Sequence, residues 1–230
     1  MRIAATDLDK KQLAAVFLTH LHSDHTSGLP DLFNTTWVVH RRKDPFELYG
    51  PRGINGVAKA ITDFYKEDIH IRRDLTEMLS PSGAKIKPHT VNEGVVYQDG
   101  GVKVTAFLVA HDPVKPAFGY RFDANGKSVV ISGDTTFSEN LVKHSRGTDV
   151  LIHEACLPEE LDKRDSPEVA ARLKRYHSTP EQAGMAAQQA GAKLLVLSHL
   201  VPGKDENVYA ERAAKTFTGK IVVGRDLMTF

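Results

Sequence analysis

The chain has 230 residues, 41% hydrophobic and 26% charged, which is typical of one globular domain that can bury a core. The 30 Lys and Arg residues nearly balance the 29 Asp and Glu residues, and the net charge of +1 gives no overall basic field for nucleic acid. No apolar run reaches the length of a membrane span, and no signal peptide is visible at Met1.

The first part of the chain is predicted to alternate short strands and helices. Residues 13–19 form an apolar run typical of a strand, and residues 26–33 predict a short helix or turn. Residues 36–40 and 46–50 are both predicted to be strands. Residues 54–69 carry apolar side chains at helical spacing, which predicts a longer helix.

The second part of the chain is richer in strands. Residues 94–111 and 117–134 each predict a β-hairpin, because an Asp-Gly-Gly or an Asn-Gly turn lies between two extended runs. Helices and strands are then expected to alternate, with helices at 138–144, 179–191 and 206–217 and strands at 148–155, 193–200 and 220–224. Hairpins followed by alternation indicate two sheets with helices outside them.

The histidine loop, residues 20–25 in the stretch FLTHLHSDHTSGLPDL, is the clearest signal of chemistry. It contains three of the eleven histidines, His20, His22 and His25, together with Asp24. Imidazole and carboxylate are common ligands for zinc and similar ions. Alternate spacing places His20 and His22 on one side of an extended loop, so Asp24 and His25 can face a second point. The pattern therefore favours two metal ions close together.

Further polar residues stand at the ends of predicted strands. They are His111, Asp134, His153 with Glu154, and His199. Polar groups at the carboxyl ends of apolar strands converge on one edge of a sheet, where sites are built. Other histidines, such as His40 and His70, are interpreted as surface or core residues. The single cysteine, Cys156, follows a buried strand and is interpreted as a packed residue.

The order HxHxDH, a later His, SGDT and a late SHL resembles the metallo-β-lactamase superfamily over essentially the whole chain. The HEA motif at Glu154 and the HST motif at His177 resemble the ribonuclease Z and arylsulfatase-like branch, as do PFELYGPRGI and AFGYRF. The resemblance implies an αββα sandwich of mixed α/β class. We expect one such domain over residues 1–230, with an insertion at about 40–95.

The resemblance also implies a ligand set. His20, His22 and His111 would hold one metal, Asp24, His25 and His199 the other, and Asp134 would bridge them. Two zinc ions about 3.5–4 Å apart would supply hydroxide at neutral pH, and manganese or iron would suit the same ligands.

Three residues are candidates for catalysis by the same resemblance. Asp24 belongs to the motif itself, His177 would protonate the leaving oxygen or stabilise the developing anion, and Glu154 would orient His177.

Two features differ from the family pattern. Several strands normally precede HxHxDH, whereas here the cluster starts at His20, so Met1 resembles an internal methionine and we expect an amino-terminally truncated fold. The compartment is therefore left open, with cytoplasmic as the default and periplasmic or secreted as alternatives. In ribonuclease Z a long arm that grips tRNA commonly lies between the third histidine motif and the bridging aspartate, and only a hairpin separates His111 from Asp134 here.

The favoured hypothesis is a dinuclear metal hydrolase of a small sulfate ester or phosphodiester. The alternative is a tRNA 3′-processing endonuclease of the ribonuclease Z type. β-Lactamase activity and a non-catalytic relic are weaker alternatives. The expected partner is a small anionic ester, with tRNA second. No membrane is expected, and relatives in this branch are often homodimers.

Overall fold

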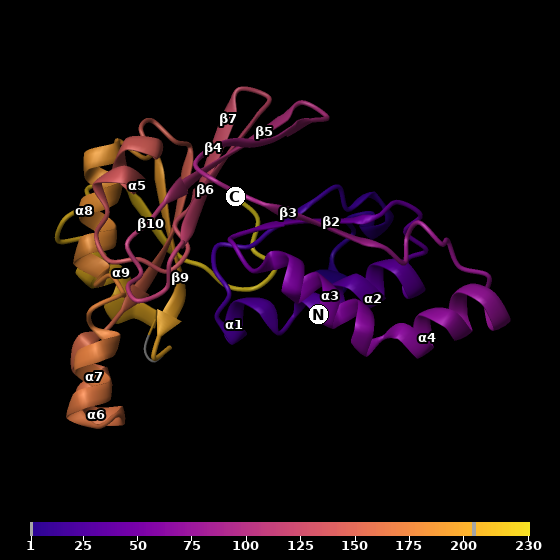
Figure 1. Cartoon of the computed structure of the whole chain (residues 1–230). Helices are drawn as coiled ribbons and strands as arrows, with labels where there is room; N and C mark the ends of the chain where they lie inside the picture. The colour runs from indigo at the N-terminus through magenta and orange to yellow at the C-terminus, as the bar shows by residue number, and fades with distance from the viewer. Residues whose placement is uncertain (1, 204–205) are drawn as a thin grey trace. The chain divides into compact units, whose positions relative to one another are not determined.

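The computed structural model describes residues 2–203 and 206–230 (Figure 1). The chain forms two compact units, one that extends to Val91 and one that begins at Asn92. The first unit contains a three-stranded sheet and the second a seven-stranded sheet. The predicted mixed α/β class with two sheets is therefore confirmed.

The sheet of the first unit is parallel, with strand order β1-β2-β3. Its strands are β1 (Val16–Phe17), β2 (Phe46–Gly50) and β3 (Ile86–Thr90). Strands β1 and β2 were predicted from the sequence, whereas β3, which contains Pro88, was not. Proline removes one backbone donor and is tolerated here because β3 lies at the edge of the sheet.

The helical segments of the first unit are short. They are η1 (Arg2–Ala5), η2 (Lys10–Gln12), α1 (Ser23–Thr26), α2 (Leu29–Asn34), η3 (Thr35–Val39), α3 (Ile54–Phe64), α4 (Lys66–His70) and η4 (Ile71–Thr76). The helix predicted over residues 54–69 is present but is interrupted at Tyr65, between α3 and α4. Helix α3 buries Ile54, Ala58 and Ile61 at helical spacing and contacts β2 and β3.

The strand predicted at residues 36–40 is wrong. Residues 36–39 belong to η3, one wide helical turn that continues α2 without a break, and His40 follows its end. Trp37 lies one turn after Phe33, and both side chains are fully buried with their rings 6.1 Å apart. Core packing at helical spacing therefore outweighs the strand propensity of a β-branched, aromatic run.

The sheet of the second unit has the order β10-β9-β8-β7-β6-β5-β4. Its strands are β4 (Gly94–Asp99), β5 (Val102–Leu108), β6 (Phe118–Ala124), β7 (Lys127–Ile131), β8 (Val150–Cys156), β9 (Leu194–Val201) and β10 (Lys220–Val223). Strands β4 to β7 are antiparallel, as both predicted hairpins require, and β7 to β10 are parallel. The parallel strands all present their carboxyl ends at one edge, which positions the side chains that follow them.

Helices α5 (Glu139–His144), α8 (Pro180–Ala190) and α9 (Glu206–Ala213) cover one face of this sheet (Figure 1). Helix α8 begins with the predicted capping box, in which Thr179 and Gln182 each bond the other's backbone. It ends at Gly191, whose φ of 63° is the left-handed conformation that glycine adopts easily. Small side chains of α8 pack closely against the sheet.

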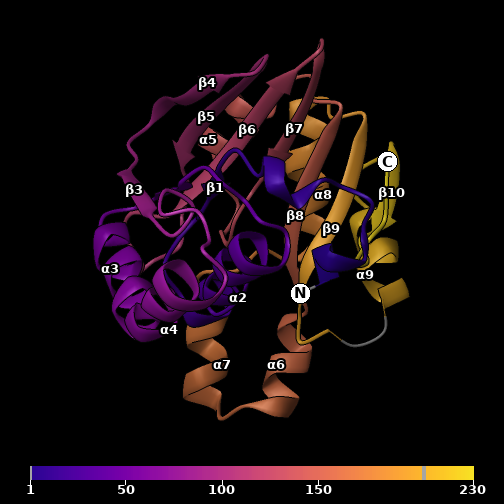
Figure 2. The ribbon, with the colours of Figure 1, turned by 90° about the vertical axis from the view of Figure 1, so that its right-hand side faces the viewer.

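Two more helices, α6 (Pro158–Arg164) and α7 (Pro167–Leu173), were not predicted from the sequence. They lie side by side and project from the second unit (Figure 2). Each has Pro in its first turn, and Ser166 caps α7, which are ordinary helix-start signals. This α6–α7 hairpin joins the end of β8 to the HST segment. Over residues 2–203 and 206–230, no helix has the length and apolarity of a membrane span.

Arg42 is a fully buried cation in the core of the first unit. Its guanidinium donates to Thr36 Oγ1 at 3.1 Å, to the Gly83 carbonyl at 3.1 Å and to the Asp44 carbonyl. Burial lowers the pKa of Arg42 to about 10, so it stays charged at neutral pH. Arg42 therefore links the end of η3 to the segment before β3.

Replacing this buried guanidinium should destabilise the protein. We expect Arg42→Met to lower the free energy of unfolding by about 3 kcal/mol, because the buried Gly83 carbonyl and the buried Thr36 hydroxyl lose their donor. Urea unfolding measures the change. Arg52→Met, at an exposed arginine, is the matched control and should stay within about 0.5 kcal/mol of the wild type. Equal stability of the two variants would contradict the role assigned to Arg42.

Candidate active site

The histidine loop begins three residues after β1, and its last three residues form the start of α1. His20 is fully buried, and its Nε2 lies 3.0 Å from His22 Nδ1. The His20 and His25 rings are 4.1 Å apart, and Asp24 Oδ2 lies 3.4 Å from His25 Nε2. The sequence prediction that these four side chains gather at the end of a strand is therefore matched by their local geometry.

The ligand atoms of the loop fall into two pairs. One potential ligand nitrogen of His20 and one of His22 lie within 4.8 Å of each other. A carboxylate oxygen of Asp24 and a ring nitrogen of His25 are equally close. The Nδ1 of His20 is 3.1 Å from the Thr19 hydroxyl, which orients its ring. This division agrees with the sequence argument that two metals would share the loop.

A second set of side chains gathers at the carboxyl edge of the seven-stranded sheet. This strand-end cluster consists of His111, Asp134 and His199. Asp134 has carboxylate oxygens within 4.8 Å of ring nitrogens of both His111 and His199. His111 and Asp134 are buried, whereas His199 is partly exposed. The convergence predicted from strand order is therefore present within the second unit.

His199 reaches the cluster through an irregularity in β9. Glu154 of β8 pairs with Ser198 and Ala155 pairs with Leu200, so His199 is skipped in the register. Its φ of 45° is rare for a residue other than glycine. Bulges of this kind redirect a side chain and are common beside active sites. Here the bulge brings His199 Nε2 to 3.7 Å from Asp134 Oδ2.

The donor chemistry of the cluster suits divalent metals. His111 donates from Nδ1 to the Tyr176 carbonyl at 2.9 Å, which leaves Nε2 as its ligand atom. Metal-binding histidines usually have such a partner on the other ring nitrogen, because it fixes the tautomer and the ring orientation. Imidazoles with one carboxylate form a ligand set for zinc, manganese or iron.

Glu154 and His177 form a buried pair beside this cluster. Both carboxylate oxygens of Glu154 lie 3.0 Å from His177 Nδ1. The Thr135 backbone N–H donates to Glu154 Oε1 at 2.7 Å. One ligand atom each of Glu154, His177 and His199 lie within 4.8 Å of one another. The contact therefore fixes the orientation of the His177 ring through Nδ1.

Backbone contacts around the pair were not visible in the sequence. Ser178 donates from Oγ to the Thr135 carbonyl at 2.7 Å, and the Cys156 N–H donates to the Ser178 carbonyl at 2.7 Å. These bonds join the HST segment to the loop after β7 and to the end of β8. Thr135 of the SGDT motif and Ser178 of the HST motif are visible in the sequence as polar residues. Their hydrogen-bond partners could not be predicted, because they depend on the tertiary fold.

Burial controls the electrostatics of this region. Burial raises the pKa of Glu154, and the nearby Asp134 charge adds to the effect, while the Thr135 N–H opposes it. Burial also raises the pKa of Cys156 to about 12. A thiol with that pKa is neutral at pH 7, which agrees with the interpretation of Cys156 as a packed residue.

His153 is separate from the ligand clusters. It is buried and donates from Nδ1 to the Glu154 carbonyl at 2.7 Å. Burial lowers the pKa of His153 to about 4. The neutral ring therefore helps to fix the backbone at Glu154.

Comparison with known proteins identifies the family. The model of the family described as Beta-lactamase superfamily domain matches residues 2–200. The chain belongs to the metallo-β-lactamase superfamily. It is 34% identical to a protein named ribonuclease Z from Mycobacterium bovis (strain BCG / Pasteur 1173P2), over 98% of this chain and 82% of the relative. A ribonuclease Z of Mycobacterium sp. (strain KMS) is 33% identical over 99% of this chain and 80% of the relative.

Solved structures agree on the fold of this superfamily member. The short form of human tRNase Z has a TM-score of 0.68 at 23% identity, covering 98% of this chain and 82% of that chain. The metallo-β-lactamase fold protein YhfI from Bacillus subtilis has a TM-score of 0.67 at 19% identity, covering 96% and 78%. The family resemblance and the fold class predicted from the sequence are thus confirmed, and this chain is a metal-dependent hydrolase of the superfamily.

The buried neutral ring of His153 predicts a pH-dependent stability. In the unfolded chain His153 takes up a proton below its ordinary pKa of 6.5, but in the folded protein only below about 4. Protonation thus favours the unfolded chain, and stability should fall as the pH drops from 6.5 to 4, by about 3 kcal/mol for this residue.

Urea unfolding at several pH values tests this effect. His153→Gln should show a shallower loss of stability across that window than the wild type, whatever its stability at neutral pH. His40→Gln is the control and should keep the wild-type dependence. Parallel pH profiles for the wild type and His153→Gln would contradict the assignment.

Proposed function

We propose that this chain is a metal-dependent endoribonuclease of the ribonuclease Z type, which cleaves a phosphodiester in the 3′ extension of a tRNA precursor. This is the alternative of the sequence analysis, and the comparisons favour it over the small sulfate ester or phosphodiester that was placed first. The observation that carries the proposal is an identity of 33–34% with proteins named ribonuclease Z over 98–99% of this chain.

Seven side chains are proposed as metal ligands, on the family pattern. They are His20, His22 and His111 for one ion, Asp24, His25 and His199 for the other, and Asp134 as the bridge. The pairing of donors within the histidine loop and within the strand-end cluster supports this assignment. Divalent ions held by this set, with zinc the first to test, would supply Lewis acidity and activate water at neutral pH.

His177 is proposed as the group that acts on the leaving oxygen. Cleavage of a phosphodiester breaks the bond between phosphorus and one ester oxygen, and that oxygen then needs a proton or a hydrogen-bond donor. The Glu154 carboxylate accepts from His177 Nδ1, so Nε2 is the nitrogen able to donate to the leaving oxygen. A charged Glu154 would also stabilise the protonated ring.

Glu154 acts as a positioning residue in this account, because it contacts the substrate only through His177. Its own orientation is fixed by the Thr135 N–H, and its backbone N–H donates to Ser132 Oγ at 3.1 Å. The loop after β7 thus holds both the carboxylate and the backbone of Glu154, which keeps the imidazole in one rotamer and lowers the entropy lost when the substrate binds.

A small ester stays the second candidate because of one observation. The stretch between His111 and Asp134 contains only a loop and the β6–β7 hairpin, with no inserted domain. An arm that grips tRNA, as in ribonuclease Z, is therefore absent from this stretch, all of which the structure describes. Small substrates need no such arm, so the two candidates differ in whether RNA is turned over efficiently.

Substrate competition on one zinc-loaded preparation tests the proposal. We expect a 3′-extended tRNA precursor to be cut at one position, with a kcat/KM at least about 100-fold above that for an aryl sulfate. Gel mapping of the RNA and absorbance assays of the aryl ester give the two rates. Faster turnover of the aryl sulfate, with the precursor left intact, would contradict the ribonuclease proposal and favour the small-ester hydrolase.

The Glu154→Gln variant, purified and loaded with zinc in the same way, distinguishes RNA cleavage by this protein from cleavage by a contaminating nuclease. The amide cannot stabilise a protonated His177, so kcat on RNA should fall by about 100-fold while the cleavage position stays the same. Glu211→Gln, at an exposed carboxylate of α9 outside the cluster, is the matched control and should keep the wild-type kcat. An unchanged kcat in Glu154→Gln would remove Glu154 and its orienting role from the mechanism.

A further inference from the structure

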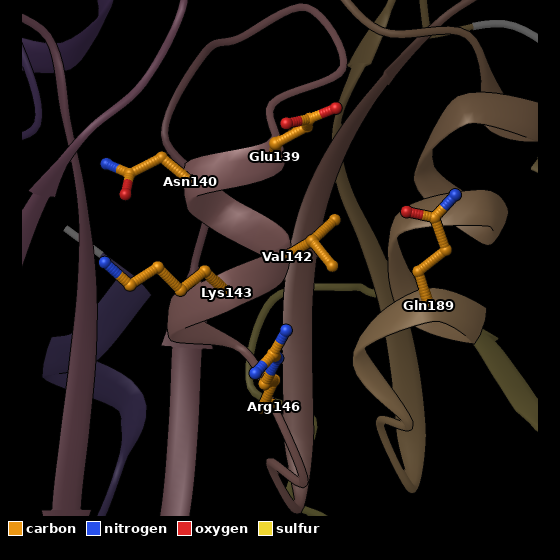
Figure 3. A pocket seen from close by; sticks show the side chains of 6 residues that line it. All are labelled: Glu139, Asn140, Val142, Lys143, Arg146 and Gln189. Carbon is orange, nitrogen blue, oxygen red and sulfur yellow. The ribbon is translucent and has the colours of Figure 1, made fainter.

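A groove of about 470 Å³ lies on the helical side of the second unit, between α5 and α8 (Figure 3). Five of its lining residues come from α5 and the turn after it, and one comes from α8. They are Glu139, Asn140, Val142, Lys143, Arg146 and Gln189. All but Val142 are polar or charged, so the groove suits a hydrated, charged ligand better than an apolar one.

The two cations of the groove, Lys143 and Arg146, outnumber its one carboxylate, Glu139. Lys143 and Arg146 are exposed, and neither forms an ion pair with any residue in 2–203 or 206–230. Carboxylates at the same end of the unit already have partners, since Asp149 lies 2.8 Å from Lys193 Nζ and Asp123 lies 3.0 Å from Arg121 Nε. The positive charge of Lys143 and Arg146 is therefore available to an anionic ligand.

Hydrogen bonds hold the walls of the groove in place. Gly147 donates its backbone N–H to the Ala190 carbonyl at 2.9 Å, which joins the turn after α5 to the end of α8. Arg121 donates to the carbonyls of His144 and Arg146 at 2.9 and 3.2 Å. A fixed surface loses little entropy when it binds, so this geometry favours recognition of a ligand.

In the sequence, the groove residues begin shortly after the strand-end cluster. Helix α5 begins at Glu139, only five residues after Asp134, and Arg146 lies just beyond its other end. Figure 3 shows Glu139 and Arg146 at opposite ends of the groove. A polyanion that runs along α5 from its first turn would meet Lys143 and then Arg146.

We propose that this groove binds phosphates of the RNA backbone outside the scissile bond. The inference rests on the proposed ribonuclease function and answers how RNA is held without an arm between His111 and Asp134. Lysine, arginine and side-chain amides are the groups that contact nucleic-acid phosphates, and such contacts hold a strand without reading its sequence. Lys143 and Arg146 supply the charge, and the Gln189 amide supplies a neutral donor.

The test compares RNA cleavage by zinc-loaded wild type and the double variant Lys143→Gln/Arg146→Gln. We expect KM for the tRNA precursor to rise about tenfold at low salt, with kcat changed by less than about twofold. Each lost phosphate contact lowers the slope of log affinity against log salt by about 0.7–0.9. The difference between the two proteins should therefore shrink by about eightfold between 50 and 200 mM salt.

Two further variants exclude effects of net charge and folding. Lys103→Gln/Lys220→Gln removes the same charge from exposed strand positions of the same unit and should leave KM unchanged. Lys143→Arg/Arg146→Lys keeps both charges and should restore most of the RNA affinity and the salt slope.

Each outcome has a distinct meaning. Equal KM values for the wild type and the groove variant, with the precursor still cleaved, would overturn the groove assignment and leave the ribonuclease function standing. An equal rise in KM in the Lys103/Lys220 control would also overturn it, since net charge alone would then explain the effect. A wild type that does not cleave the precursor at all would refute the ribonuclease function itself.

Discussion

The site of the second unit depends on one buried carboxylate. Glu154 accepts a hydrogen bond from the Thr135 backbone and contacts Nδ1 of His177, so one side chain joins the loop after β7, the strand β8 and the segment before α8. Burying a carboxylate is costly unless it is hydrogen-bonded, and here both oxygens have partners. Loss of this side chain would affect three segments at once, including the loop that contains Asp134.

Much of the fold and the candidate site could be predicted because both follow from simple patterns. Strands β5, β7 and β8 run in the same direction, so His111, Asp134 and Glu154 could be placed together from the predicted hairpins and strand order. The bulge in β9 that directs the His199 side chain could not be predicted, because a register shift gives no signal in the sequence. Residues 36–40 were mispredicted since burial of Trp37 at helical spacing outweighs local propensity. The α6–α7 hairpin was missed because most of its residues are polar, although Ser166 marks a helix start.

The two main functional hypotheses differ in what must hold the substrate, not in the chemistry. An oriented imidazole beside the proposed metal ligands could serve a sulfate ester or an RNA phosphodiester. RNA also requires contacts beyond the scissile bond, because each neutralised phosphate adds to affinity. The groove along α5 offers such contacts through Lys143 and Arg146, whereas the β6–β7 hairpin is too short to form an arm. Similarity to proteins named ribonuclease Z and the charge of this groove therefore support the same substrate class.

Metal content tests the central claim, that the histidine loop and the strand-end cluster together hold two divalent ions for hydrolysis. Elemental mass spectrometry on zinc-reconstituted, desalted protein gives the number of ions per chain. The account predicts two for the wild type and no more than one for Asp134→Ala, because that variant loses the proposed bridge. Fewer than two ions in the wild type, or two in both proteins, would contradict the account.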